Sequence, residues 1–280
     1  MTFSIVARSA DGESWGVAVA SKFLAVGAAV PAAVAGVGAI ATQASANVAY
    51  KGLALSHLDD GATAAVALQR LLEEDEGRDH RQVGIVDLDG TAASHTGSEC
   101  LAWAGSVVGD GYAIQGNILT GPEVAEAMER AWRESDEDAP LARRLLAALA
   151  AGDEAGGDSR GRQSAAVLVV REGAGYEGMD DVAVDLRVDD AQSCGGAPIP
   201  ELVRLLDLND LYLTASTDEE KVTVTPELAA ELEQLARAAG ARDFQAWVGT
   251  ENYEMRVAPD TSWVDRRVLE IIRATPGAQG

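Results

Sequence analysis

The N-terminal part of the chain alternates between apolar and polar positions with the period of β-strands. Apolar residues recur at every second position of residues 2–9, and the segment 15–21 (WGVAVAS) follows the turn signal Asp11-Gly12. Two such runs joined by a short turn predict a β-hairpin. A further strand is predicted over residues 38–43 (GAIATQ), whose small side chains suit burial beneath helices.

The period then changes to that of a helix. Residues 61–75 place Ala64, Leu68 and Leu72 on one face, which predicts an amphipathic helix. A second hairpin is predicted around the turn Asp89-Gly90. The remaining predicted elements are a strand over 112–119, a helix from about 121 with Pro122 in its first turn, a helix over 140–151, and strands over 164–170 and 182–188.

Several of these strands are apolar on both faces, which is typical of sheets covered by helices. The turn-rich segment 189–200 follows the last strand, and the chain beyond it is mainly helical in pattern. We therefore expect an α+β domain over residues 1–192 and a small helical domain over residues 193–280.

Three aromatic residues of the C-terminal part, Trp247, Tyr253 and Trp263, allow two interpretations. They could stack on sugar rings, or they could form the core of a small helical unit. The second interpretation is favoured, because the cytoplasmic protein that we expect would have little access to peptidoglycan.

Composition restricts the classes of function. Of 280 residues, 47% are hydrophobic, which is ample for a folded core, and 45 acidic against 22 basic residues give a net charge of −23. This charge argues against nucleic acid or an anionic membrane as a partner. Either the partner is cationic or the host cytoplasm is very salty, and the even spread of acidic residues favours the halophilic interpretation.

No apolar run looks long enough to span a bilayer, and the N-terminus lacks the basic and apolar regions of a signal peptide, so we expect a cytoplasmic protein. Cys100 and Cys194 are far apart and are expected as reduced thiols. The three histidines have no metal-binding spacing. We expect neither a metal nor a cofactor.

Thr2 is a candidate nucleophile, because removal of Met1 would leave its α-amine free. A threonine hydroxyl needs a base to accept its proton. The α-amino group has a pKa of about 7.7–8.0, close to neutral pH, where general bases work best. This is the N-terminal-threonine form of nucleophilic catalysis. The alternative is that Thr2 is only the first residue of an edge strand.

Several separate motifs strengthen the catalytic interpretation. They are MTFSIVAR, WGVAVASKFLAVGAAVP, GAIATQASAN, YAIQGNIL and DSRGRQSAAVLVV. Together they resemble an uncharacterised family of the N-terminal-nucleophile (Ntn) hydrolase superfamily over residues 2–190. The resemblance implies a four-layer αββα sandwich and hydrolysis of amide bonds, with Thr2 as the nucleophile. The C-terminal part resembles a small peptidoglycan-binding-like domain that accompanies this family.

The chain departs from the proteasome-type version of this site. Where such a site has an aspartate after the second strand, this sequence has Ser21. The third strand also lacks the expected lysine, and Lys22 is the only lysine nearby. If the chain is catalytic, the Thr2 amine itself is therefore the expected base.

Other polar residues are candidates for the same site. Asn117 could donate its amide to an oxyanion or simply form a turn. Gln43 and Asn47 follow an apolar strand, and backbone N–H groups near Ala44 could form an oxyanion hole; a polar strand end is the alternative.

The segment RGRQS, which leads into the strand 164–170, supplies two more candidates. Arg162 could bind a substrate carboxylate with two hydrogen bonds or pair with Asp158 to hold its loop. Ser164 could hydrogen-bond the Thr2 amine, or it could only begin the strand. These patterns predict an amidohydrolase that acts on a small-molecule or peptide amide and forms homo-oligomers. The alternative is a non-catalytic scaffold that acts through its C-terminal domain.

Overall fold

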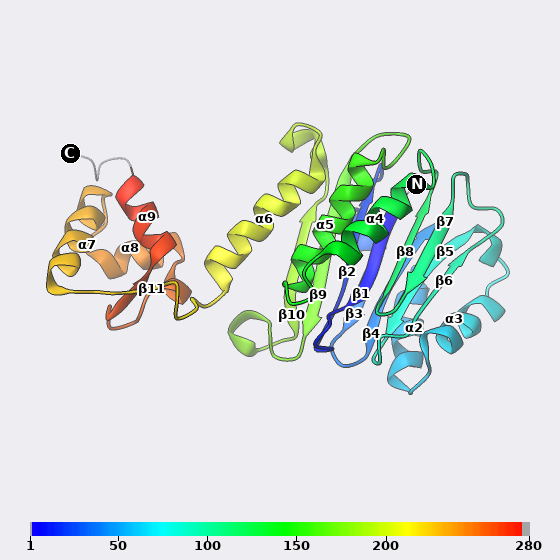
Figure 1. The fold of residues 1–280 in the computed structure, drawn as a ribbon, viewed down its shortest axis with the longest axis horizontal. Coiled ribbons are helices and arrows are strands. Elements are labelled where there is room, and N and C mark those ends of the chain that lie inside the picture. Colours follow the sequence, from blue (N-terminus) through cyan, green and yellow to red (C-terminus); the bar gives the residue numbers. More distant parts are fainter. Residues whose placement is uncertain (1, 276–280) are drawn as a thin grey trace. The chain divides into compact units, whose positions relative to one another are not determined.

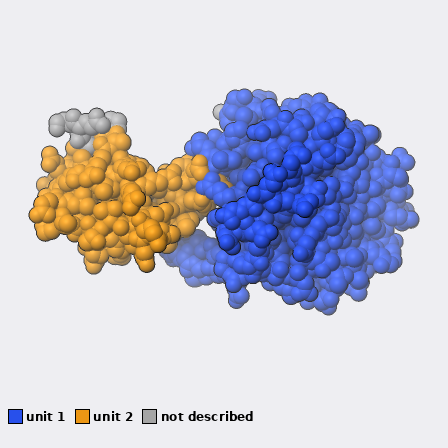
Figure 2. Space-filling model, viewed as in Figure 1, with its two compact units in different colours: residues 1–205 blue, residues 206–280 orange. Residues whose placement is uncertain are grey.

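The computed structural model describes residues 2–275. The chain divides into two compact units, residues 1–205 and 206–280 (Figure 2). The first unit carries both large sheets, and the second has a small core of its own.

A six-stranded antiparallel sheet forms the centre of the first unit, in the order β10-β9-β2-β1-β8-β7 (Figure 1). Its strands are β1 (Thr2–Arg8), β2 (Ser14–Ser21), β7 (Gly105–Gly109), β8 (Tyr112–Asn117), β9 (Ser164–Arg171) and β10 (Val182–Val188). Strand β1 lies between β2 and β8, so Thr2 heads a central strand and not an edge strand.

A second antiparallel sheet has four strands in the order β3-β4-β5-β6. They are β3 (Pro31–Val34), β4 (Gly38–Ala44), β5 (Arg81–Asp87) and β6 (Ala92–Thr96). Strands β4 and β5 of this sheet pack against β1 and β8 of the first. Val6, Val19 and Val86 are among the fully buried residues of the apolar cluster between the sheets.

Helices cover the outer faces of both sheets (Figure 1). Helix α5 (Leu141–Glu154) packs on β1, β2 and β9, and α4 (Glu123–Glu134) lies against α5 and β8. On the other side, α2 (Ala49–Asp59) packs on β4, and α3 (Ala64–Glu73) packs on β5 and β6. With both faces of each sheet covered, strands such as β1 and β2 are buried along almost their whole length.

Shorter elements complete the first unit. The helical turn α1 (Val26–Ala29) follows β2, and 3₁₀ turns occur at Arg78–His80, Tyr176–Gly178 and Ala191–Cys194. Helix α6 (Pro198–Leu213) contains the point at which the two units divide.

The second unit contains α7 (Pro226–Ala238), α8 (Phe244–Glu251), α9 (Arg266–Ala274), a 3₁₀ turn (Glu254–Arg256) and a two-stranded sheet of β11 (Lys221–Thr223) and β12 (Trp263–Asp265). Trp247 and Tyr253 are buried in its core. Trp263 is only half-buried, and the ammonium group of Lys221 lies 5.1 Å from its ring centre. The core interpretation is thus confirmed for Trp247 and Tyr253.

A buried ion pair also holds the second unit together. The Arg256 guanidinium lies 2.9 Å from the Asp265 carboxylate, and the two side chains are 6% and 1% exposed. Arg256 also donates to the Asp210 carbonyl, and Ser216 donates to Asp265. The pair therefore joins the end of α6 to β12.

The chain is therefore a mixed α+β protein with antiparallel sheets and a small, mainly helical C-terminal unit, as the sequence predicted. Every helix among the described residues is too short or too polar to cross a bilayer.

Candidate functional site

A row of polar side chains crosses the six-stranded sheet at the end where β1 begins. Thr2 pairs directly with Asn117 on one side and with Ser21 on the other, and Ser21 pairs with Ser164. Directly paired residues of an antiparallel sheet place their side chains on the same face. All four are buried, with Thr2 the most exposed at 7%. The structure therefore brings together four of the residues that the sequence singled out.

The Thr2 hydroxyl is held by its neighbour on β2. Its Oγ1 lies 3.1 Å from the Ser21 Oγ, within hydrogen-bond distance. Ser4 and Val6 share the face of β1 on which Thr2 lies, and Val6 belongs to the cluster between the sheets. The hydroxyl therefore points toward the second sheet.

A buried network of side-chain amides lies next to this row, between the two sheets. Its members are Ser4 of β1, Gln43 of β4, Gln82 of β5, and Gln115 and Asn117 of β8. Each is at most 2% exposed. Such buried polar groups need hydrogen-bond partners, and in this network most of them partner one another, although the Gln115 Oε1 has no partner in the described structure.

Backbone carbonyls fix which way these amides face. The Gln82 Nε2 lies 2.7 Å from the Gly116 carbonyl and 3.2 Å from the Gly105 carbonyl, and carbonyls can only accept. The Gln82 Oε1 must then face the amide nitrogens of Gln43 and Asn117, at 2.8 and 2.9 Å. The orientations of Gln43 and Asn117 follow from that of Gln82.

This orientation defines what Asn117 can do. Its Nδ2 donates to Gln82 and makes a long contact of 3.5 Å with the Thr2 carbonyl. Both contacts of its amide nitrogen are thus made with the protein. Asn117 helps to hold the head of β1 in place, which differs from the oxyanion role considered for it.

Gln43 is the side chain of β4 that reaches Thr2. Its Nε2 donates to the Thr2 carbonyl at 3.2 Å. Lys22 is exposed, just beyond the end of β2. Within residues 2–275, no charged side chain is hydrogen-bonded to the Thr2 hydroxyl. The site therefore has an uncharged amide on the strand where a proteasome-like site would carry a lysine.

Ser164 is engaged with the segment that follows β2. Its hydroxyl donates to the Phe23 carbonyl and accepts from the Val26 backbone N–H at 3.1 Å. The structure thus assigns Ser164 a role in anchoring residues 23–26, and not the expected contact with the terminus of β1.

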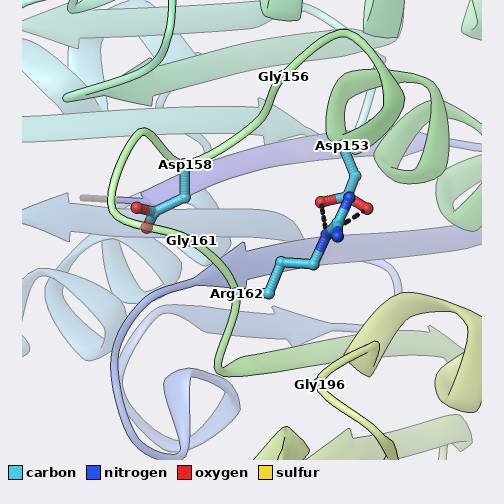
Figure 3. A pocket seen from close by; sticks show the side chains of 6 residues that line it. All are labelled: Asp153, Gly156, Asp158, Gly161, Arg162 and Gly196. Carbon is cyan, nitrogen blue, oxygen red and sulfur yellow. Dashed lines mark hydrogen bonds and ion pairs between the residues drawn. The ribbon is translucent and has the colours of Figure 1, made fainter.

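Arg162 lies at a surface pocket of about 290 Å³, which the loop between α5 and β9 lines together with Gly196 (Figure 3). Its Nε lies 2.7 Å from the Asp153 carboxylate, so the considered pairing with Asp158 is wrong. Asp158 instead pairs with Arg160. The Arg162 side chain is 51% exposed, and its terminal nitrogens make no hydrogen bond with the described part of the chain.

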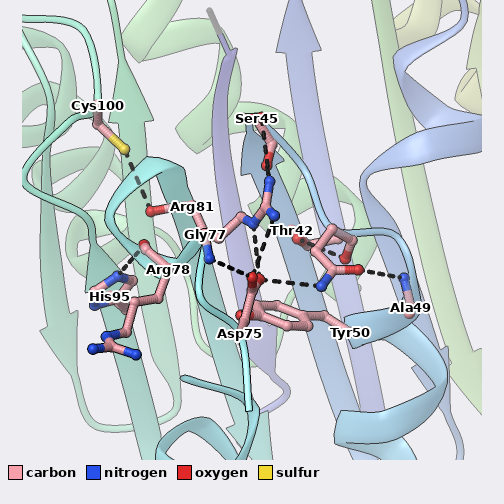
Figure 4. A network of polar contacts seen from close by, with 11 residues as sticks. Thr42, Ser45, Ala49, Tyr50, Asp75, Gly77, Arg78, Arg81, His95 and Cys100 are labelled. Carbon is pink, nitrogen blue, oxygen red and sulfur yellow. Dashed lines mark hydrogen bonds and ion pairs between the residues drawn. The ribbon is translucent and has the colours of Figure 1, made fainter. Parts of the chain in front are cut away.

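Asn47 belongs to a different network, centred on Asp75 (Figure 4). The Asp75 carboxylate accepts hydrogen bonds from Arg81, Tyr50, Asn47 and the Gly77 backbone. These bonds, with Arg81 contributing most, hold the pKa of the Asp75 carboxyl well below its usual range. Burial, and then the bond to Asp75, raise the pKa of the Tyr50 phenol.

The Asp75 network fixes the segment that follows β4. Arg81 donates to the Ser45 carbonyl and hydroxyl, and the Asn47 side chain accepts from the Ala49 backbone at the start of α2. Ala44 has a left-handed backbone, with φ of 65°. Asn47 therefore shapes the turn after β4, whereas Gln43 reaches Thr2.

Metal binding has no visible basis in the part of the chain that the structure describes. There, no group of three or more His, Cys, Asp or Glu side chains is arranged to hold an ion.

The sequence matches a protein-family model described as "Family of unknown function (DUF1028)" over residues 2–202. The chain belongs to the DUF1028 family. The crystal structure of a DUF1028 protein from Silicibacter pomeroyi is 33% identical and has a TM-score of 0.67, with 78% of this chain and 90% of that chain covered.

Further comparisons concern other parts of this DUF1028 protein or more distant relatives. Residues 228–272 match a model described as "Putative peptidoglycan binding domain". Anbu, an ancestral β-subunit from Yersinia bercovieri, is 10% identical with a TM-score of 0.33, over 74% of this chain and 93% of that chain. No curated protein matches the sequence.

Sequence reasoning missed two polar residues near the site of this DUF1028 chain, Gln82 and Gln115, and considered Asp158 only as a partner of Arg162. Gln82 and Gln115 are the centre and one end of the amide network, and Asp158 lies beyond the head of β1. A signal was present for the first two, because each is a long polar side chain within an otherwise apolar strand. The position of Asp158 near the head of β1 depends on the path of its loop.

Proposed function

We propose that this DUF1028 protein is an Ntn-type amidohydrolase in which Thr2 attacks an amide carbonyl after Met1 has been removed. The observation that carries the proposal is the position of Thr2 at the head of central strand β1, with its hydroxyl 3.1 Å from that of Ser21. Helices on the outer faces of two packed antiparallel sheets are also the arrangement expected of a four-layer αββα sandwich.

The chemistry needs few groups. The Thr2 hydroxyl attacks the carbonyl carbon as its proton passes to the free α-amine, and the ammonium then protonates the leaving amine. Water hydrolyses the resulting ester with the same amine as base, which restores Thr2 and releases the acid. Ser21 holds the Thr2 hydroxyl in position. Since the amides of Gln43 and Asn117 are already engaged, backbone N–H groups near Ala44 are the candidates for oxyanion stabilisation.

The pocket at Arg162 suggests the class of substrate. Asp153 orients the guanidinium through its Nε, and the terminal nitrogens remain available for a planar anion. The geometry suits an amide that carries a carboxylate, such as an N-acyl amino acid or a short peptide. Arg162→Met would remove this contact and raise KM for substrates with a carboxylate more than for their neutral amides.

Hydrolysis assays with a free N-terminus test the proposal. The chain is prepared with Thr2 exposed, as checked by intact mass, and is incubated with N-acyl amino acids, short peptides and cyclic amides. We expect turnover that Thr2→Ala abolishes and Thr2→Ser retains in part, because serine keeps the hydroxyl and the amine. Equal turnover by the wild type and Thr2→Ala would contradict the proposal.

A non-catalytic scaffold is the second candidate. Gln43, which replaces a charged partner beside Thr2, favours it, as does the separate core of the C-terminal unit. This candidate predicts that the native protein keeps Met1 and that residues 206–280 carry the binding activity, including any affinity for peptidoglycan fragments. Retention of binding together with absence of turnover would support it.

A further inference from the structure

The loop between α5 and β9 crosses the end of the central strand. Strand β1 lies between β2 and β8 in the sheet, and both neighbours end opposite Thr2, at Ser21 and Asn117. Asp158 accepts a hydrogen bond from the Lys22 backbone on the β2 side, at 2.7 Å. On the β8 side it forms an antiparallel bridge with Leu119. A residue bonded to both sides lies in line with β1, off its N-terminal end.

Neighbouring residues of the loop also bond to β2 and to the segment that follows β8. The Ser159 N–H donates to the Ile118 carbonyl, and the Gly157 carbonyl accepts from the Thr120 N–H. Farther along, the Gln163 N–H donates to the Ser21 carbonyl. Residues 157–163 therefore bridge the segments that follow β2 and β8, beyond the end of the sheet at which β1 begins.

The Asp158 carboxylate is buried at this position and keeps the capacity to accept one more hydrogen bond. Its side chain is 2% exposed. Oδ1 accepts from the Arg160 backbone, and Oδ2 accepts from the Lys22 backbone and the Arg160 guanidinium. A carboxylate has about four acceptor positions, of which these three donors leave one.

We propose that Asp158 is the docking residue for the α-ammonium group that Thr2 exposes once Met1 is removed. The carboxylate lies off the strand end from which that group emerges, and an ammonium group supplies the donor that the remaining acceptor position lacks. Asp158 is thus a positioning residue that keeps the amine beside the Thr2 hydroxyl. The inference rests on the proposed function only in requiring a free Thr2 amine.

Other charged groups lie in the same region as Asp158. Arg160 pairs with Asp158, Lys22 follows Ser21 and is exposed, and Arg162 pairs with Asp153 in the adjoining pocket. Asp153 provides a matched control, because it lines the same pocket as Asp158 but makes no bond to β2 or β8 in the described structure.

The pKa of the Thr2 amine is the direct readout. The full chain is released from a cleavable N-terminal fusion so that it begins at Thr2, and the rate at which the amine is acetylated is followed against pH by mass spectrometry. A carboxylate within ion-pair distance raises the pKa of an amine by about one unit or more. We expect the wild-type value to lie above the usual value of about 7.7–8.0, Asp158→Asn to lower it by about one unit, and Asp153→Asn to leave it unchanged.

Three results would overturn the inference: a wild-type value at or below the usual one, no change in Asp158→Asn, or equal changes in both variants. The wild-type value decides the matter even if Asp158→Asn does not fold. The two proposals fail separately. A shifted amine without amide hydrolysis refutes the enzyme alone, whereas Thr2-dependent hydrolysis with an unshifted amine refutes the role of Asp158 alone.

Discussion

Replacement of Gln82 by methionine removes the centre of the amide network with little change in volume. Gln82 is fully buried, and its side chain joins β5 to β7 and β8 through the Gly105 and Gly116 carbonyls and bonds to Asn117 and Gln43 through its oxygen. Methionine has a similar length but neither donates nor accepts strongly. The substitution therefore tests whether this network stabilises the packing of the two sheets.

The loss of stability depends on the hydrogen-bond partners that Gln82 leaves behind. Gln43 keeps its hydrogen bonds to the Thr2 and Gln115 carbonyls, so its amide nitrogen stays paired without Gln82. Asn117 keeps only its long contact of 3.5 Å, and the Gly116 carbonyl loses a donor at 2.7 Å. The Gly116 carbonyl remains within the β7–β8 ladder, so Asn117 is the buried group left without a good partner. Such a group costs about 1–3 kcal/mol, and we expect the free energy of unfolding to fall by about that amount.

Native-state hydrogen exchange read by mass spectrometry measures this cost within the first unit. Peptides from β5 and β8 report the free energy of unfolding there, independently of the C-terminal unit. Gln69→Met is the control, because Gln69 is exposed on α3 and bonds only Glu73; its effect should stay within about 0.5 kcal/mol. A Gln82→Met effect as small as that of Gln69→Met would refute the reasoning.

Three further predictions concern stability. The pKa of Asp75 is lower in the folded than in the unfolded chain, so the ionised carboxylate stabilises the fold fully above the unfolded pKa of about 4, and this contribution is lost as pH falls toward the folded value. Urea unfolding at acid and neutral pH should show that Asp75→Asn is destabilised relative to the wild type mainly at neutral pH. The same difference in stability at both pH values would contradict this prediction. Arg256→Met leaves the Asp265 carboxylate buried without its cation and should destabilise the C-terminal unit by about 3–5 kcal/mol. The control Arg273→Met removes an exposed ion pair and should cost at most about 1 kcal/mol. Hydrogen exchange of peptides from α9 measures both variants, and equal effects would refute the stabilising role of the buried pair. Because the net charge is −23, raising KCl from about 0.1 to about 1 M screens the repulsion among acidic side chains and should raise Tm in thermal unfolding. An unchanged or lower Tm would show that this repulsion does not limit stability.

The strands were predictable where alternation and turn residues agreed. Strand β10 has the predicted bounds, and β1 and β2 differ from theirs by one residue. Helix α2 was not predicted. It buries Tyr50, Ala54 and Leu58 on one face, but Leu53 on another face is 46% exposed and obscures the helical period. Strands β3 and β7 were also missed, because four or five residues give too short a pattern.

The site was only partly predictable, for a physical reason. Thr2, Ser21 and Asn117 meet because they are paired in register, and each strand carries its own local signal. Gln82 bonds to Gln43 of its own sheet but also to Gly105, Gly116 and Asn117 of the other sheet, and nothing in the pattern of β5 indicates which strand packs above it. Likewise, Asp158 gains its position from a loop that crosses the sheet, and Arg162 pairs with Asp153 of the preceding helix.

The most direct test of the central claim is the site at which an N-terminal-threonine-reactive β-lactone modifies the full chain. Tandem mass spectrometry locates the adduct, with Thr2→Ala as the control and the Met1-retaining chain as a second control. The account predicts a single ester on the Thr2 hydroxyl, only in protein whose α-amine is free. An unmodified Thr2 in a chain that has lost Met1, or equal modification of Thr2→Ala, would contradict it.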